Sequence, residues 1–279
     1  MTQVTTTPRV DFAALAERAR RIRREIITST TAAGSGHPTT SLSGVEILTA
    51  LYFGGILRYD PRRPQWPDRD RFVLSEGHGA PLLYAVLAEA LYFPVEELMT
   101  LRKLGSRLEG HPNMRKVPGV EASTGSLGEG LSIGIGHALA ARLDGRDYRV
   151  FVMTGDGELD EGQVWEGAMA AAHFNLTNLI CIVNNNEYQQ TNAIAVVMNT
   201  KPIAEKWRAF RWHTVEVDGH DLAAVHAALL EARGGGDAPR CIVAHTVKGK
   251  GVSFIEGHQG SHGRALTPEE ADRALKEIG

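Results

Sequence analysis

The sequence predicts a three-layer α/β domain built on a doubly wound, mostly parallel sheet. Two apolar runs, residues 150–154 and 179–183, have the length of buried strands, and residues 161–174 between them carry small apolar side chains at helical spacing. A strand, a helix and a strand of about these lengths form a right-handed crossover that joins parallel neighbours. Further helical and strand-like segments extend this unit to a single domain over residues 1–279.

The first helix is expected over residues 11–33. Asp11 is a suitable N-terminal cap, and apolar residues from Leu15 to Ile26 recur on one face of the pattern. The glycines that begin at Gly34 end the helix. Residues 1–10, which carry no such periodicity, are expected to be a flexible N-terminal segment.

The same criteria predict the remaining elements. Further helices are expected at 45–53, 81–91, 95–101, 222–232 and 268–278, and further strands at 71–75, 214–217 and 241–244. Two glycine-bearing stretches, 105–127 and 249–263, are predicted to be loops, and long loops in a compact domain usually carry function. In a doubly wound sheet, ligands bind at the carboxyl ends of the strands, where these loops fall.

Composition excludes several classes of partner. The net charge of −3 gives no electrostatic basis for nucleic-acid binding, and no apolar run reaches the roughly 18 residues of a membrane span. Residues 1–8 lack the apolar core of a signal peptide. Cys181 and Cys241 each lie in an apolar strand and are expected to be buried thiols. These features predict a cytoplasmic protein with neither nucleic-acid nor membrane partners.

A cation-binding edge is predicted where two neighbouring strands end. Asp156 lies in a Gly-Asp-Gly turn after the first strand of the crossover, and Asn186 follows the second strand. The ends of parallel neighbours meet at one edge of a sheet, so these oxygen ligands should come together. Hard oxygen donors beside a glycine turn suit a magnesium ion that carries a diphosphate.

Four histidines lie in predicted loops beside glycine or proline, namely His37, His78, His111 and His262. Their separations match no local zinc motif. At the predicted ligand edge they are suited to hydrogen-bond polar substrate groups and to move protons near neutral pH.

The Gly-Asp-Gly turn at 155–157, followed by asparagines at 185–186, is similar to the thiamine diphosphate motif. Further segments make the chain resemble the N-terminal half of transketolase, in the order that the family has them. These are GSGHP at 34–38, DRFVLSEGH at 70–78, GHP at 110–112, STGSLGEG at 123–130, GDGELDEG at 155–162 and SHG at 261–263. The resemblance covers about residues 11–265.

The resemblance implies that the chain binds thiamine diphosphate with Mg²⁺, for which Ca²⁺ or Mn²⁺ can substitute. It makes Asp156, Asn186 and the backbone carbonyl of Tyr188 the metal ligands. The implied cofactor-binding positions are His78, Gly125, Ser126, Leu127, Gly155, Gly157, Glu158 and Asn186. Ser126 departs from the proline that is frequent in that loop.

The catalytic residues that the resemblance implies are His37, His111, His262 and Glu161. The three histidines would line the substrate channel and hydrogen-bond the hydroxyl groups of a sugar. Glu161 would lie at a subunit interface, in an acidic link between two active sites.

In transketolases, the glutamate that activates the cofactor belongs to a second, pyrimidine-binding domain, and the sequence stops at Gly279, where that domain would begin. We therefore expect the N-terminal subunit of a split transketolase, active with a separate C-terminal subunit as an α2β2 assembly. Such an enzyme transfers a two-carbon ketol unit from a ketose phosphate to an aldose.

Other classes stay open at this point. The α subunit of a 2-oxo acid dehydrogenase also carries Gly-Asp-Gly, but lacks the Ser-Gly-His-Pro and Ser-His-Gly segments. A truncated deoxyxylulose phosphate synthase and a non-catalytic regulatory module are weaker alternatives. A nicotinamide-binding fold is disfavoured because the glycines of 125–136 do not have the Gly-x-Gly-x-x-Gly spacing.

Overall fold

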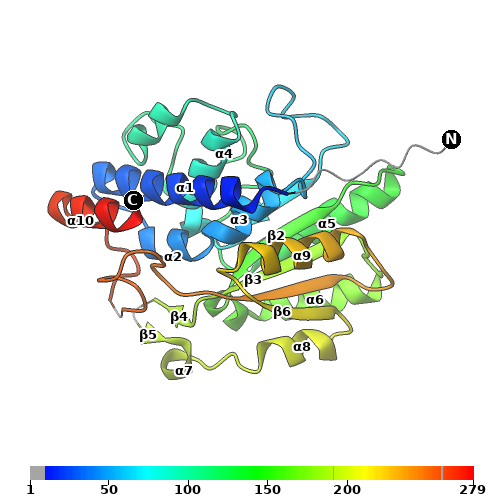
Figure 1. Cartoon of the computed structure of the whole chain (residues 1–279). Coiled ribbons are helices and arrows are strands. Elements are labelled where there is room, and N and C mark those ends of the chain that lie inside the picture. Colours follow the sequence, from blue (N-terminus) through cyan, green and yellow to red (C-terminus); the bar gives the residue numbers. More distant parts are fainter. Residues whose placement is uncertain (1–9, 191, 259) are drawn as a thin grey trace.

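The computed structural model describes residues 10–190, 192–258 and 260–279 (Figure 1). The N-terminal segment expected to be flexible therefore lies, apart from Val10, outside the described residues. Nothing in the described part of the chain is a helix long and apolar enough to span a bilayer.

The central sheet has five parallel strands. In spatial order they are β1 (Arg71–Leu74), β2 (Val150–Gly155), β3 (Leu179–Asn185), β7 (Arg240–His245) and β6 (His213–Asp218). β2 and β3 pair directly, from Val150 opposite Leu179 to Gly155 opposite Asn184. The predicted crossover of parallel neighbours is confirmed, and the ends of both strands lie at the same edge.

Helices cover both faces of the sheet, which confirms the three-layer, doubly wound architecture. One face carries α1 (Phe12–Ala33), α3 (Val45–Phe53), α4 (Ala80–Glu89), α9 (Leu222–Arg233) and α10 (Pro268–Ile278); the other carries α5 (Glu129–Leu143), α6 (Gly162–His173) and α8 (Ile203–Ala209). Because side chains alternate along a strand, Phe151 and Met153 join the first core while Val150 and Val152 join the second.

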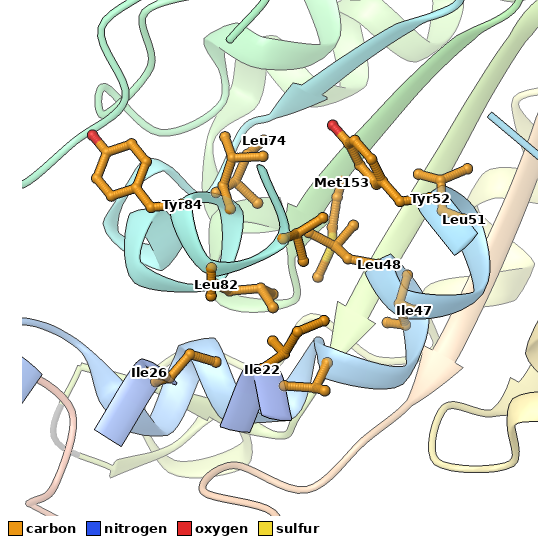
Figure 2. Close-up of a cluster of buried hydrophobic side chains, with 14 of the residues drawn as sticks. Ile22, Ile26, Ile47, Leu48, Leu51, Tyr52, Leu74, Leu82, Tyr84 and Met153 are labelled. Carbon is orange, nitrogen blue, oxygen red and sulfur yellow. The ribbon is translucent and has the colours of Figure 1, made fainter. Parts of the chain in front are cut away.

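The first core is built around α1, which forms as predicted. The Asp11 carboxylate accepts a hydrogen bond from the Ala14 backbone N–H at 3.0 Å, and Gly34 ends the helix with φ +59°. Figure 2 shows Ile22 and Ile26 of α1 facing Leu48 and Leu82, and all four side chains are buried. Helix α10 (red) lies against α1 (blue) in Figure 1.

Helix α5 was not predicted, because glycines at 130, 134 and 136 lower its helix propensity. The structure explains two of them. A β-carbon at Gly134 would lie 2.4 Å from Cγ2 of Val152, and one at Gly130 would lie 2.3 Å from Oγ of Ser75. The helix therefore approaches the sheet more closely than a larger residue would permit.

Several short elements also differ from the predictions. Residues 95–101 form a 3₁₀ helix, η2 (Val95–Thr100), instead of an α-helix. The elements that the sequence pattern missed are α2 (Pro38–Ser43), η1 (Gly77–Gly79), η3 (Gly157–Asp160), the hairpin of β4 (Tyr188–Gln189) and β5 (Asn192–Ala193), α7 (Ile194–Val197) and α8. Most of them are too short to show a hydrophobic period.

The two cysteines are buried free thiols, as predicted. Cys181 of β3 and Cys241 of β7 are paired positions of neighbouring strands, and both belong to the second core. Burial raises the pKa of the Cys241 thiol well above its ordinary value, so it is an inert core residue.

A carboxylate pair lies between α1 and α4. Arg18 and Arg21 both bond Glu89, at 3.1 and 3.0 Å, whereas Glu25 lies beside Glu89 with a buried Oε2 that has no hydrogen-bond partner among the described residues. Burial and the negative charge of Glu89 raise the pKa of Glu25 to about 8. The folded chain therefore holds this proton more tightly than the unfolded chain does.

Truncating the first core should destabilise the fold. Leu48→Ala is expected to lower the free energy of unfolding by about 2–5 kcal/mol, because it leaves a cavity beneath α1. Leu104, whose side chain is fully exposed, provides the control, and Leu104→Ala should change stability by less than about 0.5 kcal/mol. Urea denaturation measures both, and equal losses would contradict this account of the core.

Stability should also depend on the proton of Glu25. Because its pKa is raised from 4.5 to about 8 on folding, its contribution to stability is present at low pH and is lost as pH rises through that window. Glu25→Gln should therefore gain stability relative to the unmodified chain between pH 5 and pH 8. The exposed Glu166→Gln serves as the control in pH-dependent urea denaturation. Parallel stability curves for the unmodified chain and Glu25→Gln would refute the assignment.

Candidate cofactor-binding site

A cavity of about 310 Å³ opens at the carboxyl edge of the sheet. Its walls come from the ends of β1, β2 and β3 and from loops that follow α1 and β7. Every site residue predicted from the sequence lines this cavity except Ser126 and Glu161, which are exposed. Segments far apart in the chain therefore meet at one place, as the strand topology requires.

Asp156 lies at the floor of the cavity and is almost completely buried. Its Oδ1 accepts a hydrogen bond from the N–H of Gly157 at 2.9 Å, and its Oδ2 accepts one from the N–H of Glu187 at 2.5 Å. The carboxylate thus joins the ends of β2 and β3. Burial raises the pKa of Asp156 to about 7 in the absence of a cation, although these two backbone donors oppose the shift.

The three successive asparagines have different surroundings. Asn184 lies beneath the cavity, where its Nδ2 donates to Ser43 Oγ and to Glu76 Oε1, both at 2.9 Å. Asn185 contacts His245 at the end of β7, with 3.0 Å between Nδ2 and Nδ1. Of the three, Asn186 lines the cavity, so it alone can present its amide oxygen to a ligand there.

The donors at this point suit a hard cation. Asp156 offers a carboxylate and Asn186 an amide oxygen, and Tyr188 lies beside them on the cavity wall. No group of three or more His, Cys, Asp or Glu side chains in the described ranges could hold an ion by itself. A cation bound at Asp156 would therefore need further oxygens from a phosphate and from water, which is the usual coordination of Mg²⁺. The residues fit a magnesium diphosphate.

Glu158 shapes the loop at 125–128. Its Oε1 accepts hydrogen bonds from the Ser75 hydroxyl and from the Gly128 N–H at 2.8 Å, and its Oε2 accepts one from the Gly155 N–H at 3.1 Å. Gly130, in the first turn of α5, donates its N–H to Ser75 Oγ at 3.1 Å. This buried carboxylate therefore ties the ends of β1 and β2 to the start of α5.

Three of the predicted histidines form a compact cluster. The ring centroids of His37, His78 and His262 lie 4.9–5.1 Å apart in all three pairings. Burial, with smaller effects from neighbouring cations, lowers their pKa values to about 4, about 2 and about 3 respectively. All three imidazoles are therefore neutral at physiological pH, and each can both donate and accept a hydrogen bond.

The fourth histidine, His111, lies against the loop at 125–128. A β-carbon added at Gly125, where φ is +152°, would lie 3.0 Å from Cδ2 of His111. Burial lowers the pKa of His111 as well, followed by the positive charge of Arg102. The ring thus packs against the backbone of the loop that the resemblance assigns to the cofactor.

Two charged residues of the cavity were missed from the sequence. Lys248 is buried, its Nζ lies 2.7 Å from Nδ1 of His262, and burial lowers its pKa to about 8. Glu76 is buried too, and desolvation raises its pKa to about 8. A signal for Lys248 was available, because the Lys-Gly-Lys-Gly segment at 248–251 follows a predicted strand at the ligand edge.

Glu161 and Ser126 lie outside the cavity but close to its rim. Glu161 is the exposed N-cap residue of α6, and its Cβ would lie 2.7 Å from a β-carbon added at Gly128. Both residues are therefore accessible to another molecule that covers the opening.

Comparison with known proteins agrees with this geometry. A family model described as "Transketolase, thiamine diphosphate binding domain" matches residues 15–279. The 6-deoxy-6-sulfo-D-fructose transketolase subunit SqwG of Clostridium sp. is 43% identical over 245 residues, which are 88% of this chain and 89% of that protein. An apulose-4-phosphate transketolase subunit from Actinobacillus succinogenes is 41% identical over 265 residues and is covered to 95%, as is this chain.

The fold matches solved transketolases equally well. The Pichia stipitis transketolase in complex with sedoheptulose 7-phosphate superposes with a TM-score of 0.90 at 33% identity, over 96% of this chain and 41% of that one. The chain therefore spans less than half of such full-length enzymes, but nearly all of the separate subunits. The chain belongs to the transketolase family, as a member of its thiamine diphosphate-binding domain.

Proposed function

We propose that the chain is the cofactor-binding subunit of a two-chain transketolase. With a partner subunit, it would transfer a two-carbon ketol unit from a ketose phosphate to an aldose. The observation that carries this proposal is a single cavity in which the oxygen donors of Asp156 and Asn186 lie together with the buried ammonium of Lys248 and neutral histidines. These groups match both halves of a magnesium diphosphate and the hydroxyl-bearing chain of a sugar.

In this proposal Asp156, Asn186 and the carbonyl oxygen of Tyr188 hold Mg²⁺, or Ca²⁺ or Mn²⁺ in its place. Lys248 and His78 face the diphosphate, since they are the cation and the imidazole that the cavity buries near the metal ligands. The further contacts proposed for the cofactor come from Gly125, Ser126, Leu127, Gly155, Gly157 and Glu158. When bound, thiamine diphosphate supplies a nucleophilic carbon for cleaving the bond beside a ketone.

His37, His111 and His262 are proposed to bind the sugar. Nδ1 of His37 is buried without a hydrogen-bond partner among the described residues, so it has an unused hydrogen-bonding position. Nδ1 of His262 is occupied by Lys248, which leaves Nε2 for a substrate hydroxyl. A neutral imidazole accepts a proton at one nitrogen while donating from the other, as proton movement between hydroxyl and carbonyl groups requires.

The relatives support a separate partner, because two of them that this chain covers to 89% and 95% are named as subunits. We infer a partner that carries the pyrimidine-binding domain, in an α2β2 assembly in the cytoplasm, with residues 1–279 as one domain. Glu161, exposed beside Gly128, would lie at a subunit interface. The names of the same relatives make phosphorylated or sulfonated sugars the substrate class to test.

The metal site can be tested without the partner. Asp156→Ala should weaken Mg²⁺-dependent binding of thiamine diphosphate by at least roughly tenfold, because it removes the only carboxylate among the proposed ligands. Isothermal titration with and without Mg²⁺ measures the affinity. Asp144→Ala, at the exposed end of α5, is the control and should bind like the unmodified chain. An unaltered affinity in Asp156→Ala, with an intact fold by circular dichroism, would exclude the assignment.

The two-chain proposal predicts negligible turnover by the purified chain and full activity after addition of the partner subunit. Xylulose 5-phosphate with an aldose acceptor tests transketolase activity, and pyruvate with an artificial electron acceptor tests the 2-oxo acid dehydrogenase alternative. The carbon–carbon chemistry needs the activating group from the partner. Ketol transfer by the chain alone, or turnover of pyruvate only, would contradict the proposal.

A further inference from the structure

Arg102 lies between two of the loops that carry histidines. It follows η2 and has a left-handed backbone, with φ +58°, and its N–H donates to the carbonyl of Leu108 at 2.8 Å. A left-handed conformation is uncommon for a residue other than glycine, asparagine or aspartate. It persists here in a tight turn that brings residue 102 back to the Gly-His-Pro segment at 110–112.

The guanidinium of Arg102 bonds both loops at once. Its Nη1 donates to Ser35 Oγ at 3.1 Å, and its Nη2 donates to the carbonyl of Gly110 at 3.3 Å. Ser35 is two residues before His37, and Gly110 is directly before His111. One side chain therefore connects the two histidine segments, and the planar fork of arginine is needed to reach both acceptors.

The packing around this guanidinium is close. A β-carbon at Gly110 would lie 2.8 Å from Cζ of Arg102 and 2.9 Å from Nη2, so the arginine lies directly over the glycine. From α4, the Tyr84 hydroxyl contacts the same segment, at 3.0 Å from the carbonyl of Glu109 and 3.1 Å from that of His111. The backbone that carries His111 is thus held from two sides.

The charge of Arg102 is not neutralised locally. Its Nε is buried without a hydrogen-bond partner, and no carboxylate forms an ion pair with it among the described residues. For both His37 and His111, the positive charge of Arg102 is the largest influence on the pKa after burial, and it lowers the pKa. The other titratable or charged groups that act on His37 are His111, Lys248, His78 and His262.

We propose that Arg102 is a positioning residue that fixes His37 and His111 relative to each other and keeps both imidazoles in their neutral form. This inference rests on the proposed function, in which the two histidines face the sugar. Arg102 itself does not line the cavity, so it acts through the histidines and not on the substrate.

Histidine titration of the chain by NMR tests the electrostatic half of the proposal without any activity. Arg102→Gln should raise the pKa values of His111 and His37 by about half a pH unit or more, since a like charge no longer opposes protonation. Arg102→Lys, which keeps the charge, should move them less. Arg107→Gln is the matched control, because Arg107 lies on the same loop and pairs with Glu97 instead. Unchanged pKa values in Arg102→Gln would overturn the proposal.

Kinetics of the enzyme reconstituted with its partner test the positioning half. Arg102→Lys should lower kcat/KM for ketol transfer by roughly tenfold or more, because a single ammonium cannot bond Ser35 and Gly110 together. Affinity for magnesium thiamine diphosphate should not change, since Arg102 contacts neither Asp156 nor Asn186. In Arg102→Gln, the acid limb of the pH profile should also move to higher pH. Kinetics equal to those of Arg107→Gln would refute the positioning role.

Two further results separate the possible failures. Ser35→Ala removes one acceptor and keeps the charge, so it should reduce kcat/KM while leaving the histidine pKa values near those of the unmodified chain. This variant keeps the test informative if Arg102→Gln unfolds, which thermal unfolding would reveal. Absence of ketol transfer by the unmodified complex would defeat the proposed function, whereas the titrations would still decide whether Arg102 controls the two histidines.

Discussion

The geometry of the site depends on one buried carboxylate, that of Glu158. It accepts hydrogen bonds from Ser75, Gly128 and Gly155, which belong to three segments that are distant in sequence. A buried carboxylate without such partners would cost several kcal/mol, so the loop at 125–128 must keep its donors directed at Glu158. The start of α5 is brought against β1 in the same way, and only a glycine at 130 leaves room for this contact.

Above Glu158, burial determines the chemistry of the ionisable groups. The imidazoles of His37, His78 and His262 lie within contact of one another and near Lys248, so protonating any of them would place cations together in a poorly solvated space. The same desolvation raises the pKa values of Asp156 and Glu76. A cavity with neutral histidines, buried carboxyls and one ammonium is suited to receive a bound cation and anion together, because each would compensate a group that is now underpaired.

Much of this arrangement follows from the sequence. The apolar runs predicted the strands of the sheet because buried parallel strands are almost continuously hydrophobic. The order of strands and helices then placed Asp156 and Asn186 at one edge, since right-handed crossovers bring the ends of parallel strands together. Glycine and proline beside each histidine marked the loops that line the cavity, and the family motifs identified the cofactor. The helix α5 escaped because its glycines serve close packing on the sheet.

What the sequence alone determined is therefore the fold class, the ligand edge and the identity of the cofactor-binding turn, because these depend on local periodicity and on short motifs. The tertiary structure decided which residues act there. It buried Lys248 against His262, enclosed Glu76 beneath the strand ends, and brought Arg102 between Ser35 and Gly110. These roles arise from contacts between segments far apart in the chain, and a side chain's solvation and partners in such contacts leave no local pattern for the sequence to reveal.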